Sequence, residues 1–258
     1  MAITIKSERE IELMAEAGKI LEHVHNELEK ALRPGMSTKD IDTLGEEIIR
    51  SYGCIPSFLD YNGYPASICV SVNQEVVHGI PDRHRIIQEG DIVSLDAGVI
   101  YKGYHSDAAR THAVGEVSEE ARKLIQVTKE CFFEGIKYAK AGNHLFDISG
   151  AIGRYAEERG YGVVRDLCGH GIGTALHEAP EIPNYEVGRK GVKLRPGMTL
   201  AIEPMINIGT YEVDWLDDDW TVVTRDGSLS AHYENTVLIT EGEPRILSLT
   251  CGNEQTDI

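Results

Sequence analysis

Four acids in this 258-residue sequence sit where a charge is costly. Asp96 and Glu203 each follow an apolar run, "DIVSL" and "GMTLAI", that is typical of a buried strand. Burying a carboxylate without a compensating partner costs several kcal/mol. Ion pairs are one interpretation, but Arg110 is the cation close in sequence to Asp107, and residues 198–207 contain no lysine or arginine.

Divalent metal ions compensate these acids better than ion pairs do. Four carboxylates and one imidazole supply enough donors for two ions that share bridging acids about 3.5–4 Å apart. The donors are mainly oxygen and include no thiolate, which favours Mn²⁺, Fe²⁺ or Co²⁺ over a closed structural zinc site. The ligands expected are Asp96, Asp107, His170, Glu203 and Glu234.

The segment "CGHGIGTALHEAP", residues 168–180, places two histidines seven residues apart among glycines. If His170 binds metal, we expect the glycines beside it to let the backbone pass close to the ions. His177 then has another task. A second imidazole beside such a site suits the role of a hydrogen-bond donor.

The elements that must position these side chains are amphipathic helices and strands rich in β-branched residues. Helical spacing and capping residues predict helices from Ser7 to Pro34, from Ser37 to Gly53, from Ser118 towards Gly142, and from Asp147 to Gly160. Strands are expected at 67–72, 91–100, 199–208, 220–224 and 235–240.

An internal repeat relates these elements. Residues 33–53 align without gaps on residues 140–160, and the same offset places Asp96 on Glu203. With about 20 extra residues in the second copy, Asp107 meets Glu234. The sequence therefore predicts one α+β domain made of two similar halves, about 7–116 and 117–248, that close around a pseudo-twofold axis.

Composition narrows the class of protein. The chain has 42 acidic and 25 basic residues and a net charge of −17, which disfavours DNA and anionic membranes as partners. Its five cysteines include no CxxC pair, so we expect a reducing cytoplasm rather than a disulfide framework. Neither a signal peptide nor an apolar run of about 18 residues is present, and a cytoplasmic monomer is expected.

Six motifs together resemble the signature of the type I methionine aminopeptidases, within the creatinase or "pita-bread" family. They are "SLDAG", "YHSDAART", "GHGIG", "HEAP", "IEP" and "HYENTV", and the resemblance extends over residues 4–248. It implies the duplicated pita-bread fold, an antiparallel sheet covered by helices, and the same five metal ligands. It also implies hydrolytic removal of the initiator methionine from newly made chains, with a preference for a small second residue.

The resemblance also implies individual roles. His177 would hydrogen-bond the substrate carbonyl, His78 would contact the amide across the scissile bond, and Glu203 would act as general base and acid. His105 and His232 flank two of the acids and could support them. The methionine pocket would be lined by Phe58, Tyr61, Tyr64, Cys69, His78, Leu176 and Trp220.

Some positions depart from the family pattern or add to it. Many bacterial relatives have cysteine in place of Phe58 and an aromatic residue in place of Leu176, so the width of the pocket is open. Asn73 and Ser230 match positions that help to hold a monovalent cation.

Two other functions share parts of this pattern. Prolidase and aminopeptidase P use the same ligand set, but they usually have an additional N-terminal domain, for which we expect no room before Ser7. A binding protein that keeps the fold without catalysis would usually lose metal ligands, whereas all five positions are intact. The cellular metal and a contact with the ribosome are left open by the sequence.

Overall fold

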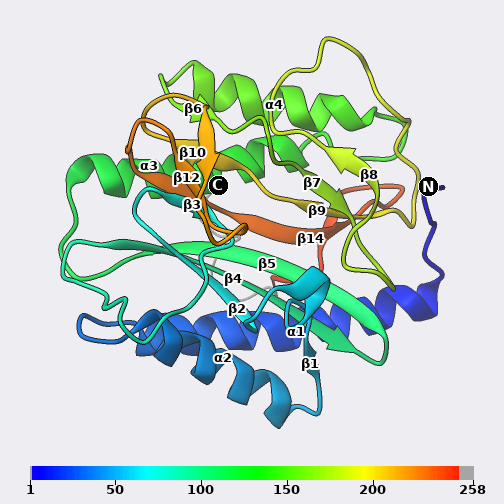
Figure 1. The fold of residues 1–258 in the computed structure, drawn as a ribbon. Helices are drawn as coiled ribbons and strands as arrows, with labels where there is room; N and C mark the ends of the chain where they lie inside the picture. The colour runs from blue at the N-terminus through cyan, green and yellow to red at the C-terminus, as the bar shows by residue number, and fades with distance from the viewer. Residues whose placement is uncertain (1, 250–258) are drawn as a thin grey trace.

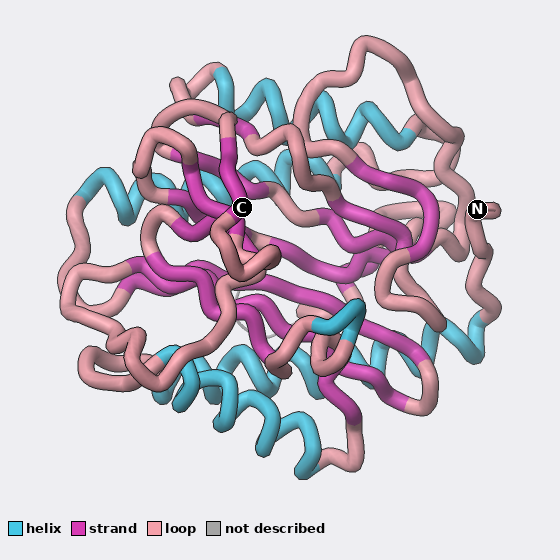
Figure 2. Tube along the Cα trace, in the orientation of Figure 1, coloured by secondary structure: helices cyan, strands magenta, loops and turns pink. Residues whose placement is uncertain are grey.

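A nine-stranded antiparallel sheet lies between two pairs of helices in the computed structural model, which describes residues 2–249 (Figure 1). The strand order is β1-β4-β5-β14-β9-β7-β8, with β2 beside β4 and β15 beside β14. Two three-stranded sheets, β13-β10-β6 and β11-β12-β3, adjoin it, and the strands of all three sheets are drawn in magenta in Figure 2.

The helices are α1 Glu8–Ala31, α2 Thr38–Ser51, α3 Glu119–Ile136 and α4 Leu145–Glu157, with a 3-10 turn, η1, at Tyr61–Gly63. The strands of the first part of the chain are β1 Ile55–Pro56, β2 Ile68–Val72, β3 Glu75–Val77, β4 Ile92–Tyr101 and β5 Tyr104–Ala113. Those that follow are β6 Gly162–Val163, β7 Gly169–Gly171, β8 Glu178–Ile182, β9 Thr199–Ile202, β10 Met205–Asn207, β11 Val213–Trp215, β12 Val222–Thr224, β13 Ser230–His232, β14 Glu234–Leu238 and β15 Arg245–Ile246.

Local sequence explains where the helices begin and which face they bury. A capping box joins Ser7 to Glu10 at the start of α1, and Met14, Leu21 and Leu28 then recur on its buried face. The helices α1 and α2 pack on β2, β4 and β5 in one apolar core, and α3 and α4 pack on β9, β10 and β14 in another. Figure 1 shows the first pair of helices below the sheet and the second pair above it.

The observed elements confirm the predicted fold class. The order β4-β5-β14-β9 places the two predicted acid-bearing strand pairs side by side, with β5 and β14 in contact at the centre. The limits of the two halves, 7–116 and 117–248, stay a prediction. No helix within residues 2–249 has the length and apolar character needed to span a bilayer.

Two predicted boundaries are wrong. The strand expected at 199–208 is broken, because β9 ends at Ile202 and β10 begins at Met205 in a different sheet. Pro204 lies in the break, where its missing N–H cannot serve a ladder. The helix expected to run towards Gly142 ends at Ile136.

Candidate metal centre and substrate cavity

Strand register places three acids on one face of the central sheet. Asp96 on β4 lies opposite Ala109 on β5, and Glu234 on β14 lies opposite the same Ala109. Asp107 on β5 lies opposite Gly98. Because side chains two residues apart on a strand share a face, Asp96, Asp107 and Glu234 all project to one side.

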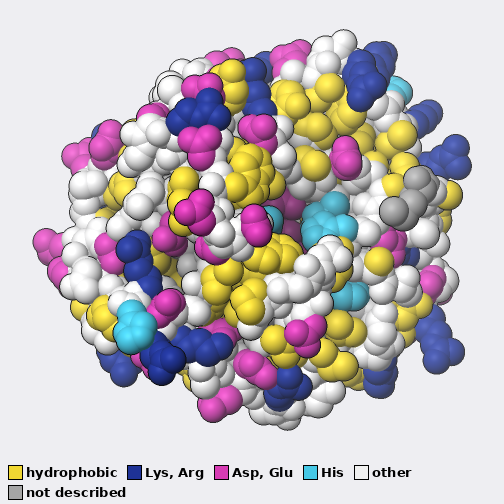
Figure 3. Space-filling model, in the orientation of Figure 1, with side chains coloured by type: hydrophobic (Ala, Val, Ile, Leu, Met, Phe, Trp, Pro, Cys, Tyr) yellow, Lys and Arg dark blue, Asp and Glu magenta, His cyan; other side chains and the backbone are white. Residues whose placement is uncertain are grey.

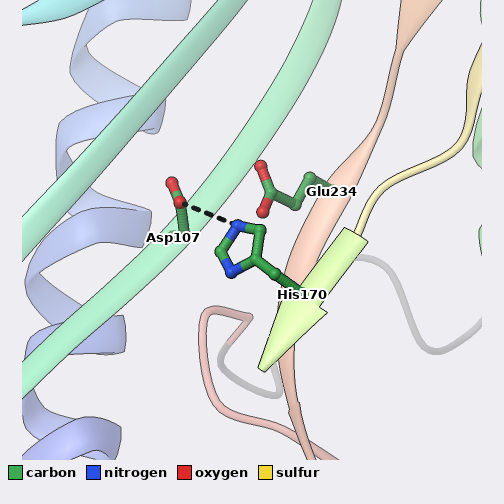
Figure 4. Close-up of side chains that lie close together, drawn as sticks. All are labelled: Asp107, His170 and Glu234. Atoms are coloured by element: carbon green, nitrogen blue, oxygen red, sulfur yellow. Dashed lines mark ion pairs between the residues drawn. The ribbon is translucent and has the colours of Figure 1, made fainter. Parts of the chain in front are cut away.

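The other half of the chain adds Glu203 and His170 to this face. Glu203 follows directly after Ile202, which pairs with Asn235, and His170 on β7 lies opposite Ala201. The His170 Nε2 atom lies 3.9 Å from Asp107 Oδ2 and 3.7 Å from Glu203 Oε1. In Figure 4, Asp107, His170 and Glu234 point towards one another from β5, β7 and β14.

Potential ligand atoms fall into two groups that share Glu234. Asp107, His170 and Glu234 offer atoms within 4.8 Å of one another, and so do Glu203, His232 and Glu234. Asp96 lies in the same cavity. The predicted ligand positions are therefore brought together.

The electrostatics of these acids fit a metal centre. Burial raises the pKa of Asp96 to about 7 and that of Glu203 to about 8, and it raises the pKa values of Asp107 and Glu234 well above the ordinary range. Within residues 2–249 the ion pairs of Asp107 and Glu203 are with histidines rather than with lysine or arginine. Among the same residues, Asp96 Oδ1, Asp107 Oδ1 and Glu234 Oε1 are buried without a hydrogen-bond partner. Divalent cations would satisfy both the charge and these atoms.

His170 is suited to be a neutral ligand. Burial lowers its pKa to about 3, so the ring carries no charge at neutral pH. Its Nδ1 lies 2.9 Å from the Gly171 carbonyl oxygen, and an N–H there donates to that oxygen and leaves the Nε2 lone pair facing the acids.

The glycines beside His170 have a different reason from the one expected. A Cβ on Gly169 would lie 2.4 Å from the Ala201 carbonyl oxygen, and one on Gly171 would lie 2.2 Å from that of Ala179. Close approach of the neighbouring backbone therefore excludes side chains here.

A cavity of about 390 Å³ contains these acids and the predicted substrate residues. The Tyr64 ring meets the Trp220 ring edge-on at 5.1 Å, and the Tyr64 hydroxyl donates to the Gly79 carbonyl oxygen. The predicted residues that line the cavity are Phe58, Tyr61, Tyr64, Cys69, His78, Asp96, Asp107, His170, Leu176, His177, Glu203, Trp220 and Glu234. Those that sequence reasoning missed are Asn62, Val77, Leu167, Cys168 and Met205.

The two predicted accessory histidines lie at this cavity. His177 Nδ1 is 2.7 Å from the Tyr61 hydroxyl, and its ring centre is 4.1 Å from that of His170. The backbone of His78 has a φ of 59°, in the left-handed region that residues other than glycine rarely adopt. The His78 ring meets the Trp220 ring edge-on. Burial lowers the pKa of His78 to about 4. Both imidazoles can therefore face a substrate in the cavity, and that of His78 is neutral.

The remaining predicted residues do not line the cavity. His232 Nε2 is 3.5 Å from Glu203 Oε2, whereas His105 Nδ1 contacts the Ser57 hydroxyl. The backbone N–H of Ser230 donates to the Asn73 carbonyl oxygen, so this pair is also adjacent. Whether Asn73 and Ser230 hold a monovalent cation stays a prediction.

Comparison with known proteins gives one consistent family. Residues 12–241 match the model of metallopeptidase family M24. A methionine aminopeptidase of Clostridium acetobutylicum is 58% identical over 96% of this chain and 99% of its own length. A methionine aminopeptidase of Thermotoga maritima has a solved structure with a TM-score of 0.94 and 46% identity, covering 96% of this chain and 100% of that one. An Xaa-Pro dipeptidase of Bacillus anthracis has a TM-score of 0.77 and 27% identity, and the match covers 95% of this chain but 62% of that one.

Proposed function

We propose that this chain, which belongs to metallopeptidase family M24, is a metal-dependent aminopeptidase that removes an N-terminal methionine from polypeptides. The observation that supports this most is the convergence of four buried acids and a neutral imidazole beside an aromatic-lined cavity. The high identity to methionine aminopeptidases over nearly the whole chain supports the substrate, since the proline-specific relative is longer and less similar.

Two divalent ions would be held by Asp96, Asp107, His170, Glu203 and Glu234. When bound, they would polarise the scissile carbonyl group and lower the pKa of the attacking water. We propose Mn²⁺, Fe²⁺ or Co²⁺ because the donors are oxygen and imidazole.

Glu203 is the proposed proton carrier. Its carboxylate projects into the cavity from the break between β9 and β10, beside the other proposed ligands. It can accept a proton from water at a carboxylate oxygen and return it to the leaving nitrogen.

His177 and His78 would act as hydrogen-bond partners of the peptide. The Tyr61 hydroxyl contacts Nδ1 of His177 and orients the ring, so that Nε2 can donate to the oxygen of the scissile carbonyl. The neutral ring of His78 would contact the amide on the other side of the bond. These contacts strengthen as the carbonyl oxygen gains negative charge.

The methionine side chain would occupy the part of the cavity formed by Phe58, Tyr64, Cys69, Leu176 and Trp220. A thioether against an aromatic ring is favourable by about 0.3–1.5 kcal/mol per contact. Carboxylates beside this pocket would attract a free α-amino group, which restricts cleavage to the first peptide bond.

The finer parts of the function are also proposals. We infer that the natural substrates are N-termini of newly made polypeptides in the cytoplasm, with a small second residue. Adjacent Asn73 and Ser230 support a monovalent cation site.

The activity is tested by incubating the metal-loaded protein with Met-Ala-Ser, Met-Lys-Ser and an Ala-Pro peptide, with and without a chelator. We expect methionine release from Met-Ala-Ser, much less from Met-Lys-Ser, and loss of turnover with the chelator. Preferential cleavage of the Ala-Pro peptide would assign the chain to proline-specific hydrolysis, and chelator-resistant turnover would refute metal dependence.

The role of Glu203 is tested with Glu203→Gln, and exposed Glu241→Gln is the matched control. We expect Glu203→Gln to abolish most turnover and Glu241→Gln to leave it unchanged. Normal turnover of Glu203→Gln at full metal occupancy would exclude a proton-carrying role.

A further inference from the structure

A second cavity opens beside the active-site cavity and continues from it. Its volume is about 720 Å³, and its lining shares Cys168, His170 and His177 with the active-site cavity. Phe58, Tyr64 and Trp220, which form the proposed methionine pocket, belong only to the active-site cavity. The two histidines therefore lie between the methionine pocket and the second cavity, which we call the exit groove.

Apolar side chains from three elements form the exit groove. Phe146 comes from the start of α4, Pro180 from the edge strand β8, and Pro183 and Val192 from the loop that follows β8. Val192 is 40% exposed. In Figure 3, hydrophobic side chains gather above a patch of histidine colour near the centre of this face.

Backbone hydrogen bonds hold the outer wall of the groove in place. Leu145 N–H donates to the Val192 carbonyl oxygen at 2.8 Å, and Phe146 N–H donates to that of Lys190 at 3.1 Å. Gly191 has a φ of 70°, and a Cβ there would lie 2.9 Å from the Phe146 ring. The loop thus packs closely on α4, and the groove is preformed.

We propose that the exit groove binds residues three to five of the substrate polypeptide in an extended conformation and favours apolar side chains there. This inference rests on the proposed function, because it assumes that the scissile bond lies at His170 and His177. Three extended residues span about 10 Å, and the groove begins at these same histidines. Aminopeptidase substrates must leave the site on the side away from the methionine pocket, which is where the groove lies.

The groove would act through burial of apolar surface. Covering one leucine or valine side chain contributes enough to change kcat/KM by about tenfold. Charged Arg189 and Glu181 also line the groove. Their side chains provide polar groups for the backbone of a bound polypeptide.

The test compares two substrates of equal length, Met-Ala-Leu-Val-Ser and Met-Ala-Ser-Ser-Ser, on the metal-loaded full chain. Val192→Asp places a charge in the groove, and Val187→Asp is the matched control, because Val187 is on the same loop but does not line the groove. We expect the wild type and Val187→Asp to prefer the apolar peptide by about tenfold in kcat/KM. We expect Val192→Asp to lose this preference and to cleave the two peptides with similar kcat/KM.

Equal kcat/KM for both peptides in the wild type would overturn the groove, although release of methionine would still uphold the activity. Binding of a fluorescent Ala-Leu-Val-Leu-Ser peptide, followed by anisotropy, decides the matter without catalysis. Binding weakened by Val192→Asp but not by Val187→Asp supports the groove even if no methionine is released. Equal binding of the peptide to all three proteins would overturn the groove. The groove would also be overturned if Val192→Asp changed only the oligomeric state of the protein, because this surface would then be a contact with a second copy of the chain.

Discussion

Removal of the metal ions should make the protein lose stability as the pH rises through the neutral range. Burial raises the pKa of Glu203 from its ordinary value of 4.5 to about 8. The folded state without metal therefore holds a proton that the unfolded state has released, and its stability falls as the pH rises towards the folded pKa.

The magnitude follows from this shift. An acid that keeps its proton only in the folded state lowers the free energy of unfolding by about 1.4 kcal/mol per pH unit. Between pH 6.5 and 8, Glu203 alone should therefore cost about 1.5–2 kcal/mol. Asp107 and Glu234, with pKa values also raised by burial, act in the same direction.

The assay is urea unfolding of the chelator-treated protein at several pH values between 6.5 and 8. We expect the wild type to lose about 1.5–2 kcal/mol relative to Glu203→Gln, which has no proton to release. The control variant Glu241→Gln, at an exposed position, should follow the wild type. Saturating Mn²⁺ should abolish or reverse the loss, because metal binding requires deprotonated acids. Parallel pH profiles of metal-free wild type and Glu203→Gln would refute the electrostatic argument.

Two further predictions concern His177 and the ion pair between Lys6 and Glu178 that lies next to it. His177→Ala should lower kcat about 100- to 1000-fold with intact metal binding, and a decrease of less than fivefold would exclude its role as a donor. Lys6→Met should lower the free energy of unfolding by about 1–3 kcal/mol, because buried Lys6 forms an ion pair with partly buried Glu178, next to His177. The exposed pair of Lys19 provides the control: Lys19→Met should cost less than 1 kcal/mol in the same urea titration, and equal losses would contradict the argument from burial.

The elements that could be predicted from the sequence are those whose boundaries and buried face are both indicated within one short segment. The capping box at Ser7 and the repeat of Met14, Leu21 and Leu28 define the first helix without any tertiary information. The break after Ile202 could not be predicted in the same way, since residues 199–208 are rich in strand-forming side chains on both sides of Pro204. The structure shows that β9 pairs with β14 whereas β10 pairs with β13, so the two parts of this segment belong to different sheets. This long-range pairing is not visible in the local sequence.

The residues of the site show the same difference between local and long-range signals. Asp96 and Glu203 could be identified because an acid after an apolar run breaks the local pattern, and the internal repeat relates the two positions. Leu167, Met205 and Val77 could not be identified, because each is an ordinary apolar residue whose place in the cavity depends on contacts with distant strands. The reason for the glycines was missed for the same cause: the backbone that excludes a side chain at Gly171 belongs to Ala179 on another strand.

The contact between Lys6 and Glu178 shows how the first residues of the chain take part in the site. Glu178 accepts hydrogen bonds from the backbone N–H groups of Thr174 and Ala175 as well as from Lys6. Burial alone would raise the pKa of Glu178, but the hydrogen bonds from Lys6 and other donors lower it, so the acid is charged at neutral pH and ties the loop to the N-terminal segment. Since His177 lies at the end of this loop, the position of its imidazole depends on an ion pair between segments that are far apart in sequence.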